Sequence, residues 1–123
     1  MANTLVVNFT FNPPVIKVTG PVKESTIERL NAVLPTVTTS RRGDRAGQPK
    51  FVFKPAPTHW TVTLDGQFCD QIGESRVMLA ILDSLEEEGV WKLASTQATT
   101  LPDNESLQQQ FSNAYCFFFK RML

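Results

Sequence analysis

The chain is poor in the residues that build metal sites, disulfides and acid–base centres. Its 123 residues include one histidine, His59, and two cysteines, Cys69 and Cys116. Their spacing matches no zinc motif, so neither a metal nor a cofactor is expected. Nothing in the sequence indicates an oxidising compartment, and we therefore expect both cysteines to be free thiols.

Net charge and long hydrophobic runs are also lacking. Twelve basic and twelve acidic side chains cancel, so no overall field attracts nucleic acid or an anionic membrane. No segment approaches the roughly 20 apolar residues of a membrane-spanning helix. The first residues, Met1–Leu5, lack the basic and apolar regions of a signal peptide. We expect a cytoplasmic protein, or a nuclear one, without membrane contact.

Catalytic motifs are scarce as well. Neither common glycine-rich phosphate loop occurs, and the one dense group of carboxylates is the run Glu86–Glu88. A small enzyme would have to use His59 as the base and Cys69 as the nucleophile, across a predicted strand. A surface histidine before a buried strand is the simpler interpretation, and Cys116 is expected to pack as a small apolar residue. A small enzyme that uses His59 and Cys69 is therefore the less favoured alternative.

What the chain does have is the alternation that is typical of strands. Leu5, Val7, Phe9 and Phe11 fall on one face of residues 5–11. Further strands are expected at residues 15–19, 36–39, 50–54, 60–64, 91–97 and 115–122. A polar connection is expected at residues 101–113.

Two segments change to the helical period. In the first, Ser25 and Glu28 form a capping box, and Pro35 ends the helix. The second begins near Glu74 and stops at Gly89, a residue suited to the left-handed position after a helix. Its apolar stripe is Val77, Met78, Ile81, Leu82 and Leu85. The pattern predicts a single α+β domain over residues 1–123, with a mainly antiparallel sheet and two helices on one face.

The two halves of the chain have a similar order of elements. Residues 1–54 and 58–123 each run through a strand, a helix, a threonine-rich segment, a loop and an aromatic strand. This order predicts two β-α-β-β repeats around a common sheet.

Three stretches of the second half form a pattern: a strand led by tryptophan at His59–Val62, a helix end at Leu82–Leu93, and an aromatic strand ending in Lys-Arg at Phe117–Arg121. In these features residues 59–121 resemble a small, mostly bacterial family of domains of unknown function. The family helix ends in Gly-Trp-Glu-Leu-Val, whereas here Val90 precedes the tryptophan and Lys92 replaces the glutamate. The resemblance implies the β-α-β-β topology and implies no active site.

The last strand carries the main functional prediction. Tyr115, Phe117 and Phe119 face one side, and Cys116 and Phe118 face the other. A strand that is apolar on both faces is covered by two layers or meets another chain, and two helices are too few to cover both faces of this sheet. We expect a non-enzymatic interaction or assembly module that binds a second copy as a homodimer, a protein partner or an apolar ligand. The interface candidates are Trp60, Trp91, Tyr115 and Phe118.

A second hypothesis rests on the basic segment at residues 40–49. Arg41, Arg42 and Arg45 could bind phosphates, while Phe118 and Trp60 offer stacking faces to bases. Three arginines on a loop are equally consistent with a solvated connection. Nucleic acid is therefore the less favoured partner.

Overall fold

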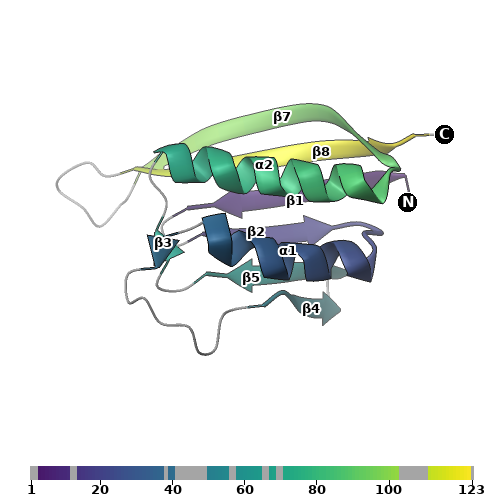
Figure 1. Ribbon diagram of the computed structural model, residues 1–123. Helices are drawn as coiled ribbons and strands as arrows, with labels where there is room; N and C mark the ends of the chain where they lie inside the picture. The colour runs from purple at the N-terminus through teal and green to yellow at the C-terminus, as the bar shows by residue number, and fades with distance from the viewer. Residues whose placement is uncertain are drawn as a thin grey trace.

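The computed structural model describes residues 3–11, 14–37, 39–40, 50–55, 58–64, 67–68, 71–102 and 111–122. In chain order the elements are β1 (Thr4–Thr10), β2 (Val15–Thr19), α1 (Glu24–Val37), β3 (Thr39–Ser40), β4 (Val52–Pro55), β5 (Thr58–Thr63), β6 (Gln67–Phe68), α2 (Gln71–Glu88), β7 (Trp91–Pro102) and β8 (Phe111–Arg121) (Figure 1). The predicted α+β class is confirmed.

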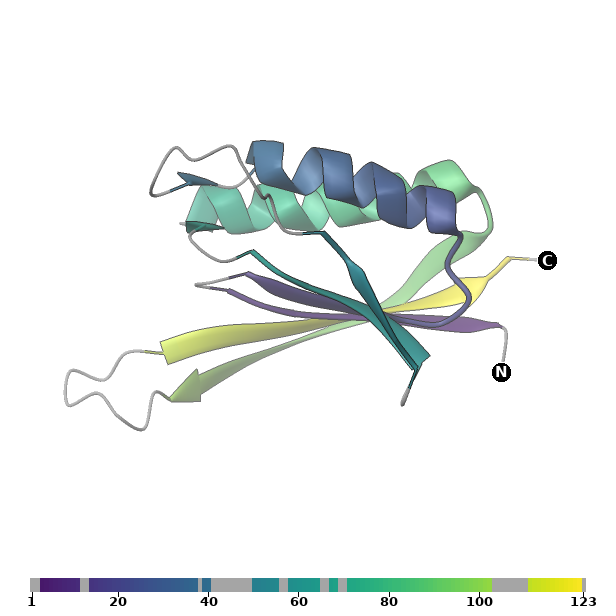
Figure 2. The ribbon, with the colours of Figure 1, turned by 90° about the horizontal axis from the view of Figure 1, so that it is seen from below.

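Six strands form one antiparallel sheet in the order β4-β5-β2-β1-β8-β7, and β3 pairs with β6 in a separate small sheet. The main sheet therefore mixes strands from both halves of the chain. The internal repeat stays a prediction, as does the single-domain assignment. Both helices lie on the same side of the sheet, and within the described residues no helix or strand lies on the other side (Figure 2).

The core lies between the helices and the sheet, where the two predicted periodicities meet. Leu5, Val7 and Phe9 of β1 are buried, as alternation requires. Phe9 is the centre of an aromatic cluster, with ring centroids 4.9 Å from Phe117 and 5.6 Å from Tyr115. The predicted stripe of α2 is confirmed, because Val77, Ile81 and Leu85 are buried and Met78 and Leu82 pack against the same core.

The predicted boundaries of α1 are wrong at both ends. The helix begins at Glu24, and the Lys23 carbonyl accepts bonds from the amides of Thr26 and Ile27, so Ser25 lies inside the first turn and is not the cap. Pro35 lies inside the helix, because near a helix end its missing amide costs a single bond. Thr36 follows in the same helix, and its hydroxyl donates to the Val33 carbonyl at 2.6 Å. The strand predicted at 36–39 is reduced to β3.

The bounds of several strands and of α2 also differ from the predictions. β4 begins at Val52, and α2 begins at Gln71 rather than near Glu74. β7 continues to Pro102 and β8 begins at Phe111, so part of the predicted polar connection is strand. Pairing with β8 continues β7 through a threonine-rich segment, which alternation alone did not identify as strand. β5 begins at Thr58, and His59 therefore lies within a strand rather than before it.

One carboxylate joins the end of α2 to the start of α1. Glu88 Oε1 accepts bonds from the Thr26 hydroxyl at 2.7 Å and from the Lys23 amide at 3.2 Å. Its Oε2 accepts a bond from Trp91 Nε1 at 2.9 Å. Glu88 lies at the unfavourable end of its own helix, yet it faces the positive end of α1, where a negative charge is stabilising. Gly89 then ends α2 with φ at 83°, and its left-handed conformation is confirmed.

Candidate binding surface

Strand register builds the surface that the helices leave bare. Alternation turns every second residue of the six strands away from the helices, and we call this surface the uncovered face. Its rows across the strands are Lys92, Lys120 and Thr4; then Ser95, Phe118, Val6 and Thr19; then Gln97, Cys116, Asn8, Lys17, Thr61 and Val52. A bulge between Leu93 and Ser95 keeps Ser95 in phase with Lys92.

An apolar strip runs along the middle of the uncovered face. Val6 and Phe118 lie directly opposite each other, and Cys116 and Ala114 follow Phe118 on β8. All four side chains are half-buried. Burial raises the pKa of the Cys116 thiol above its ordinary value, because a low-polarity environment disfavours the thiolate. The strip is therefore partly dehydrated before any partner arrives.

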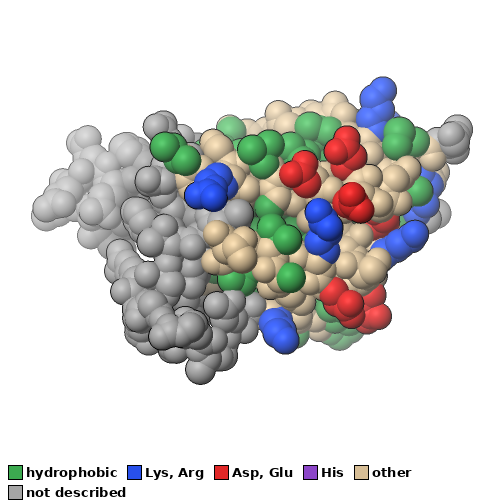
Figure 3. All heavy atoms as spheres, viewed as in Figure 1, with side chains coloured by type: hydrophobic (Ala, Val, Ile, Leu, Met, Phe, Trp, Pro, Cys, Tyr) green, Lys and Arg blue, Asp and Glu red, His purple; other side chains and the backbone are tan. Residues whose placement is uncertain are grey.

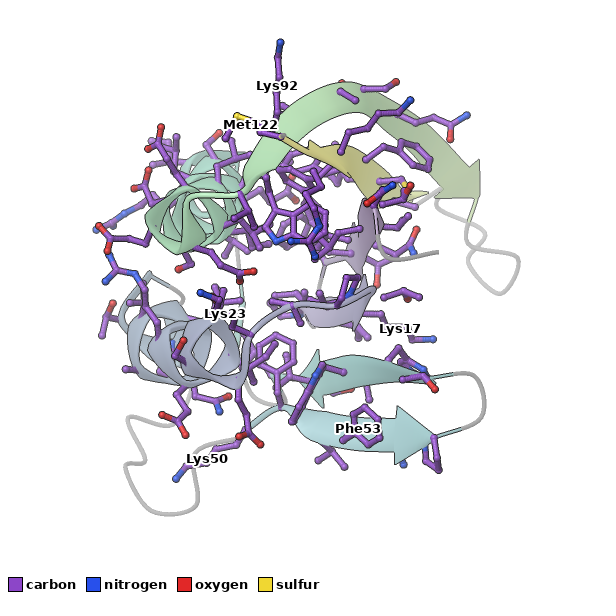
Figure 4. The ribbon with its side chains drawn as sticks, turned by 90° about the vertical axis from the view of Figure 1, so that its right-hand side faces the viewer. Lys17, Lys23, Lys50, Phe53, Lys92 and Met122 are labelled. Atoms are coloured by element: carbon purple, nitrogen blue, oxygen red, sulfur yellow. The ribbon has the colours of Figure 1, made fainter. Side chains whose placement is uncertain are left out.

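Among the described residues, the charge on the uncovered face has a single sign. Lys17, Lys54, Lys92 and Lys120 are all exposed, and none of the eight strands contains an aspartate or a glutamate. Lys92 and Lys120 are direct cross-strand partners, an arrangement of like charges that destabilises a sheet. Figure 4 shows Lys17 pointing away from the helices.

Carboxylates gather instead on the helix side. α2 contains five acidic residues and one arginine, and α1 contains Glu24, Glu28 and one arginine, Arg29. Figure 3 shows acidic side chains grouped over the two helices. The molecule is consequently polarised, with a basic sheet layer and an acidic helix layer, although its net charge is zero.

Of the four predicted interface residues, Phe118 alone lies on the uncovered face. Trp91 is 5% exposed, and the Arg121 guanidinium lies 5.0 Å from its ring centroid. Tyr115 stacks on Phe9 in the core and its hydroxyl bonds to Glu74 at 3.3 Å. Trp60 packs against the core from the helix side of β5.

Trp60 also has an edge-to-face contact with Phe53, at a centroid distance of 5.2 Å. The three aromatic residues on the helix side are thus accounted for by packing within the chain.

The residues of the alternative hypotheses are only partly described. His59 is half-buried and lies opposite Lys54 on the uncovered face, whereas Cys69 lies outside the described residues. Arg41, Arg42 and Arg45 also lie outside them. Within the described part of the chain, no group of three His, Cys, Asp or Glu side chains could hold a metal ion. No helix there is long and apolar enough to cross a membrane.

The four lysines are the feature that the sequence reasoning missed. Each occupies the outward position of an alternating strand: Lys17 lies between Ile16 and Val18, and Lys92 lies between Trp91 and Leu93. Cancellation of the overall charge concealed them. Counting charge separately for strands and helices would have found them.

No protein-family model matches the sequence, and no curated protein matches it. Among solved structures, the crystal structure of a conserved kinetoplastid-specific protein from Trypanosoma cruzi matches with a TM-score of 0.77 and 35% sequence identity, over 98% of this chain and 98% of that one. The resemblance to a bacterial domain family stays a prediction. Because both the fold and a third of the residues agree over nearly the full length, the chain belongs to the same family as this conserved kinetoplastid protein.

Proposed function

We propose that the protein is a non-enzymatic binding module that holds an acidic protein partner on the uncovered face of its sheet. The observation that carries this proposal is the unopposed positive charge around an apolar strip. Lys92 and Lys120 repel each other in the free protein. A carboxylate between them would remove that repulsion, and the half-buried Phe118 and Val6 would supply apolar contact.

A homodimer through this face is electrically unfavourable. In a twofold contact the same surface meets itself, so four lysines of one copy would approach four lysines of the other. Like charges brought together across an interface oppose association. The proposal therefore favours a different, acidic chain as the partner.

Nucleic acid is a weaker fit to the described surface. Proteins that bind single strands on a sheet stack several bases on aromatic side chains. Phe118 is the one Phe, Tyr or Trp side chain that the described part of the uncovered face offers. Binding through Arg41, Arg42 and Arg45 remains a separate hypothesis, and the same titrations test it.

The test is calorimetric titration with a short poly-glutamate peptide at about 50 mM salt, where surface charges are weakly screened. The double variant Lys17→Glu/Lys120→Glu should weaken binding about tenfold or more, because both attractive charges become repulsive. Arg29→Glu/Lys50→Glu is the matched control. It changes the net charge equally, and both residues are exposed away from the uncovered face, with Lys50 visible on the helix side in Figure 4.

Equal weakening in the two double variants would contradict the proposal, since it would mean that overall charge alone drives binding. Tighter binding of single-stranded RNA than of poly-glutamate, abolished by replacing the three arginines with serine, would favour the nucleic-acid hypothesis instead. Light scattering measures the oligomeric state. A dimer that Phe118→Asp dissociates would restore the homodimer prediction.

A further inference from the structure

The edge of the sheet at β7 differs from the edge at β4. β7 has twelve residues and is the last strand in the sheet order, so its outer backbone groups have no strand partner in the described structure. β4 has four residues, and these include Lys54 and Pro55, which protect an edge against pairing. From Leu93 to Pro102, β7 contains no charged residue and no proline before its last position. Its main protection is the bulge after Leu93.

A largely apolar groove lies beside the start of this open edge, between the last turns of α2 and the first three residues of β7. It encloses about 490 Å³, and its apolar lining is Leu82, Leu85, Trp91, Leu93, Phe119 and Met122. Leu93 is 40% exposed and Met122 is 47% exposed. Figure 4 shows Met122 between α2 and β7. Bulky apolar side chains thus line a hollow on the helix side of an unpaired strand.

Two further apolar side chains of α2 are exposed. Ile72 and Leu79 are exposed by 71% and 56%, and they share one side of the helix with Leu82 because the three positions recur at helical spacing. A second hollow of about 460 Å³ lies at the start of α2, against Met78 and Tyr115. An 18-residue helix spans about 27 Å, a length that corresponds to about eight residues of an extended strand.

We propose that the groove between α2 and β7 binds an extended peptide segment of another protein, which adds to the sheet as a strand beside β7. Addition of a strand satisfies the unpaired backbone of an edge and turns alternate side chains toward one face. Here that face is the helix side, so every second peptide residue faces α2, and those beside the start of β7 enter the groove. The other residues point toward the uncovered side of the sheet.

Charge along the groove selects the peptide further. Asp83 and Glu86 of α2 line the helix side of the hollow, and Lys92 lines the strand side. A peptide with apolar residues at alternate positions and a basic residue near each end would place its positive charges beside the α2 carboxylates. This partner is opposite in charge to the acidic partner proposed for the uncovered face. The two sites share Lys92 at their common border, so their tests use variants at other positions.

The probe is a peptide of about eight residues, capped at both ends, with leucine or valine at alternate positions, threonine between them and an arginine at each end. Fluorescence anisotropy measures its affinity for the whole chain. Leu93→Glu should weaken binding about tenfold or more, because it places a carboxylate in the apolar hollow. Val52→Glu is the matched control, since Val52 is similarly exposed, at 53%, on the opposite edge strand.

Backbone methylation of the peptide separates strand addition from simple insertion into the groove. Two peptides carry N-methyl groups at every second residue, in opposite phases. If the peptide pairs with β7, one phase should lose binding and the other should keep it, because only alternate amides face the neighbouring strand. Amide hydrogen exchange of β7 should also slow when the unmodified peptide binds.

Four outcomes would overturn the proposal: no binding at millimolar peptide, equal weakening by Leu93→Glu and Val52→Glu, equal binding of both methylated peptides, or a dimer in solution with β7 already protected from exchange. The variants that test the uncovered face, Lys17→Glu and Lys120→Glu, should leave peptide binding unchanged. The two proposals can therefore fail separately.

Discussion

Removal of the Glu88 carboxylate should destabilise the fold more than the removal of any other acidic group on α2. Its two oxygens accept bonds from three donors: the Thr26 hydroxyl, the Lys23 amide and Trp91 Nε1. The bonds from Thr26 and Trp91 are partly buried, while the bond from Lys23 is exposed. Water can therefore replace the bond from the Lys23 amide. It can replace the bonds from Thr26 and Trp91 only in part.

The magnitude follows from those two bonds. A hydrogen bond to a charged group contributes about 1.5–3 kcal/mol when it is well shielded, and partial exposure lowers this to about 1–1.5 kcal/mol each. Glu88→Ala should therefore lower the free energy of unfolding by about 2–3 kcal/mol. For a domain of this size the loss corresponds to a decrease in Tm of about 10 °C. Thermal and urea unfolding followed by circular dichroism measure both quantities.

Glu87→Ala is the control, because Glu87 is exposed and its loss should change stability by less than about 0.5 kcal/mol. A cycle combining Glu88→Ala with Thr26→Val should give a coupling energy of about 1 kcal/mol, since the two groups touch. If Glu88→Ala is no more destabilising than Glu87→Ala, the carboxylate does not join the helices and the reasoning is refuted.

Four further results are expected. Gly89→Val should cost about 1 kcal/mol from backbone strain alone, because a Cβ at Gly89 would contact nothing within 4 Å. Gly20→Ala should cost more, since φ is 135° and the added Cβ would lie 2.8 Å from the Thr4 carbonyl oxygen; equal losses in urea unfolding would show that the contact relaxes. Ser84→Ala should raise stability by about 0.5–1 kcal/mol, because the Ser84 hydroxyl is buried without a hydrogen-bond partner among the described residues, and a loss would mean that the hydroxyl is bonded. Alkylation of Cys116 in a Cys69→Ser variant should reach half its maximal rate above the ordinary thiol pKa, because burial raises the pKa of Cys116; an inflection at the ordinary value would contradict this.

The sequence predicted the layers of this fold well because periodicity records burial. Leu5, Val7 and Phe9 alternate and are buried, and Val77, Ile81 and Leu85 recur at helical spacing and are buried. Element ends were harder to predict, since they depend on long-range contacts. The length of β7 is set by its pairing with β8. The start of α1 is stabilised by Glu88, 62 residues after Thr26 in the chain.

The candidate surface was predicted only in part. Its existence could be predicted because two helices are too few to cover both faces of a sheet of six or more strands. Alternation along the last strand placed Phe118 on the uncovered side. Trp60 alternates with Val62 and Leu64, which indicates the core side, whereas Trp91 opens its strand and fits either side until strand register is known. The cross-strand pair Lys92 and Lys120 requires the same register. Local pattern identifies a face, but it does not identify the neighbours on that face.

The most direct test of the central claim is an amide chemical-shift map of the protein titrated with poly-glutamate at about 50 mM salt. The account predicts that the largest shifts fall on the uncovered face, at Lys17, Phe118 and Lys120, and that Arg29 and Lys50 on the helix side change little. Largest shifts at Arg29 and Lys50, with the amides of the uncovered face unmoved, would contradict it.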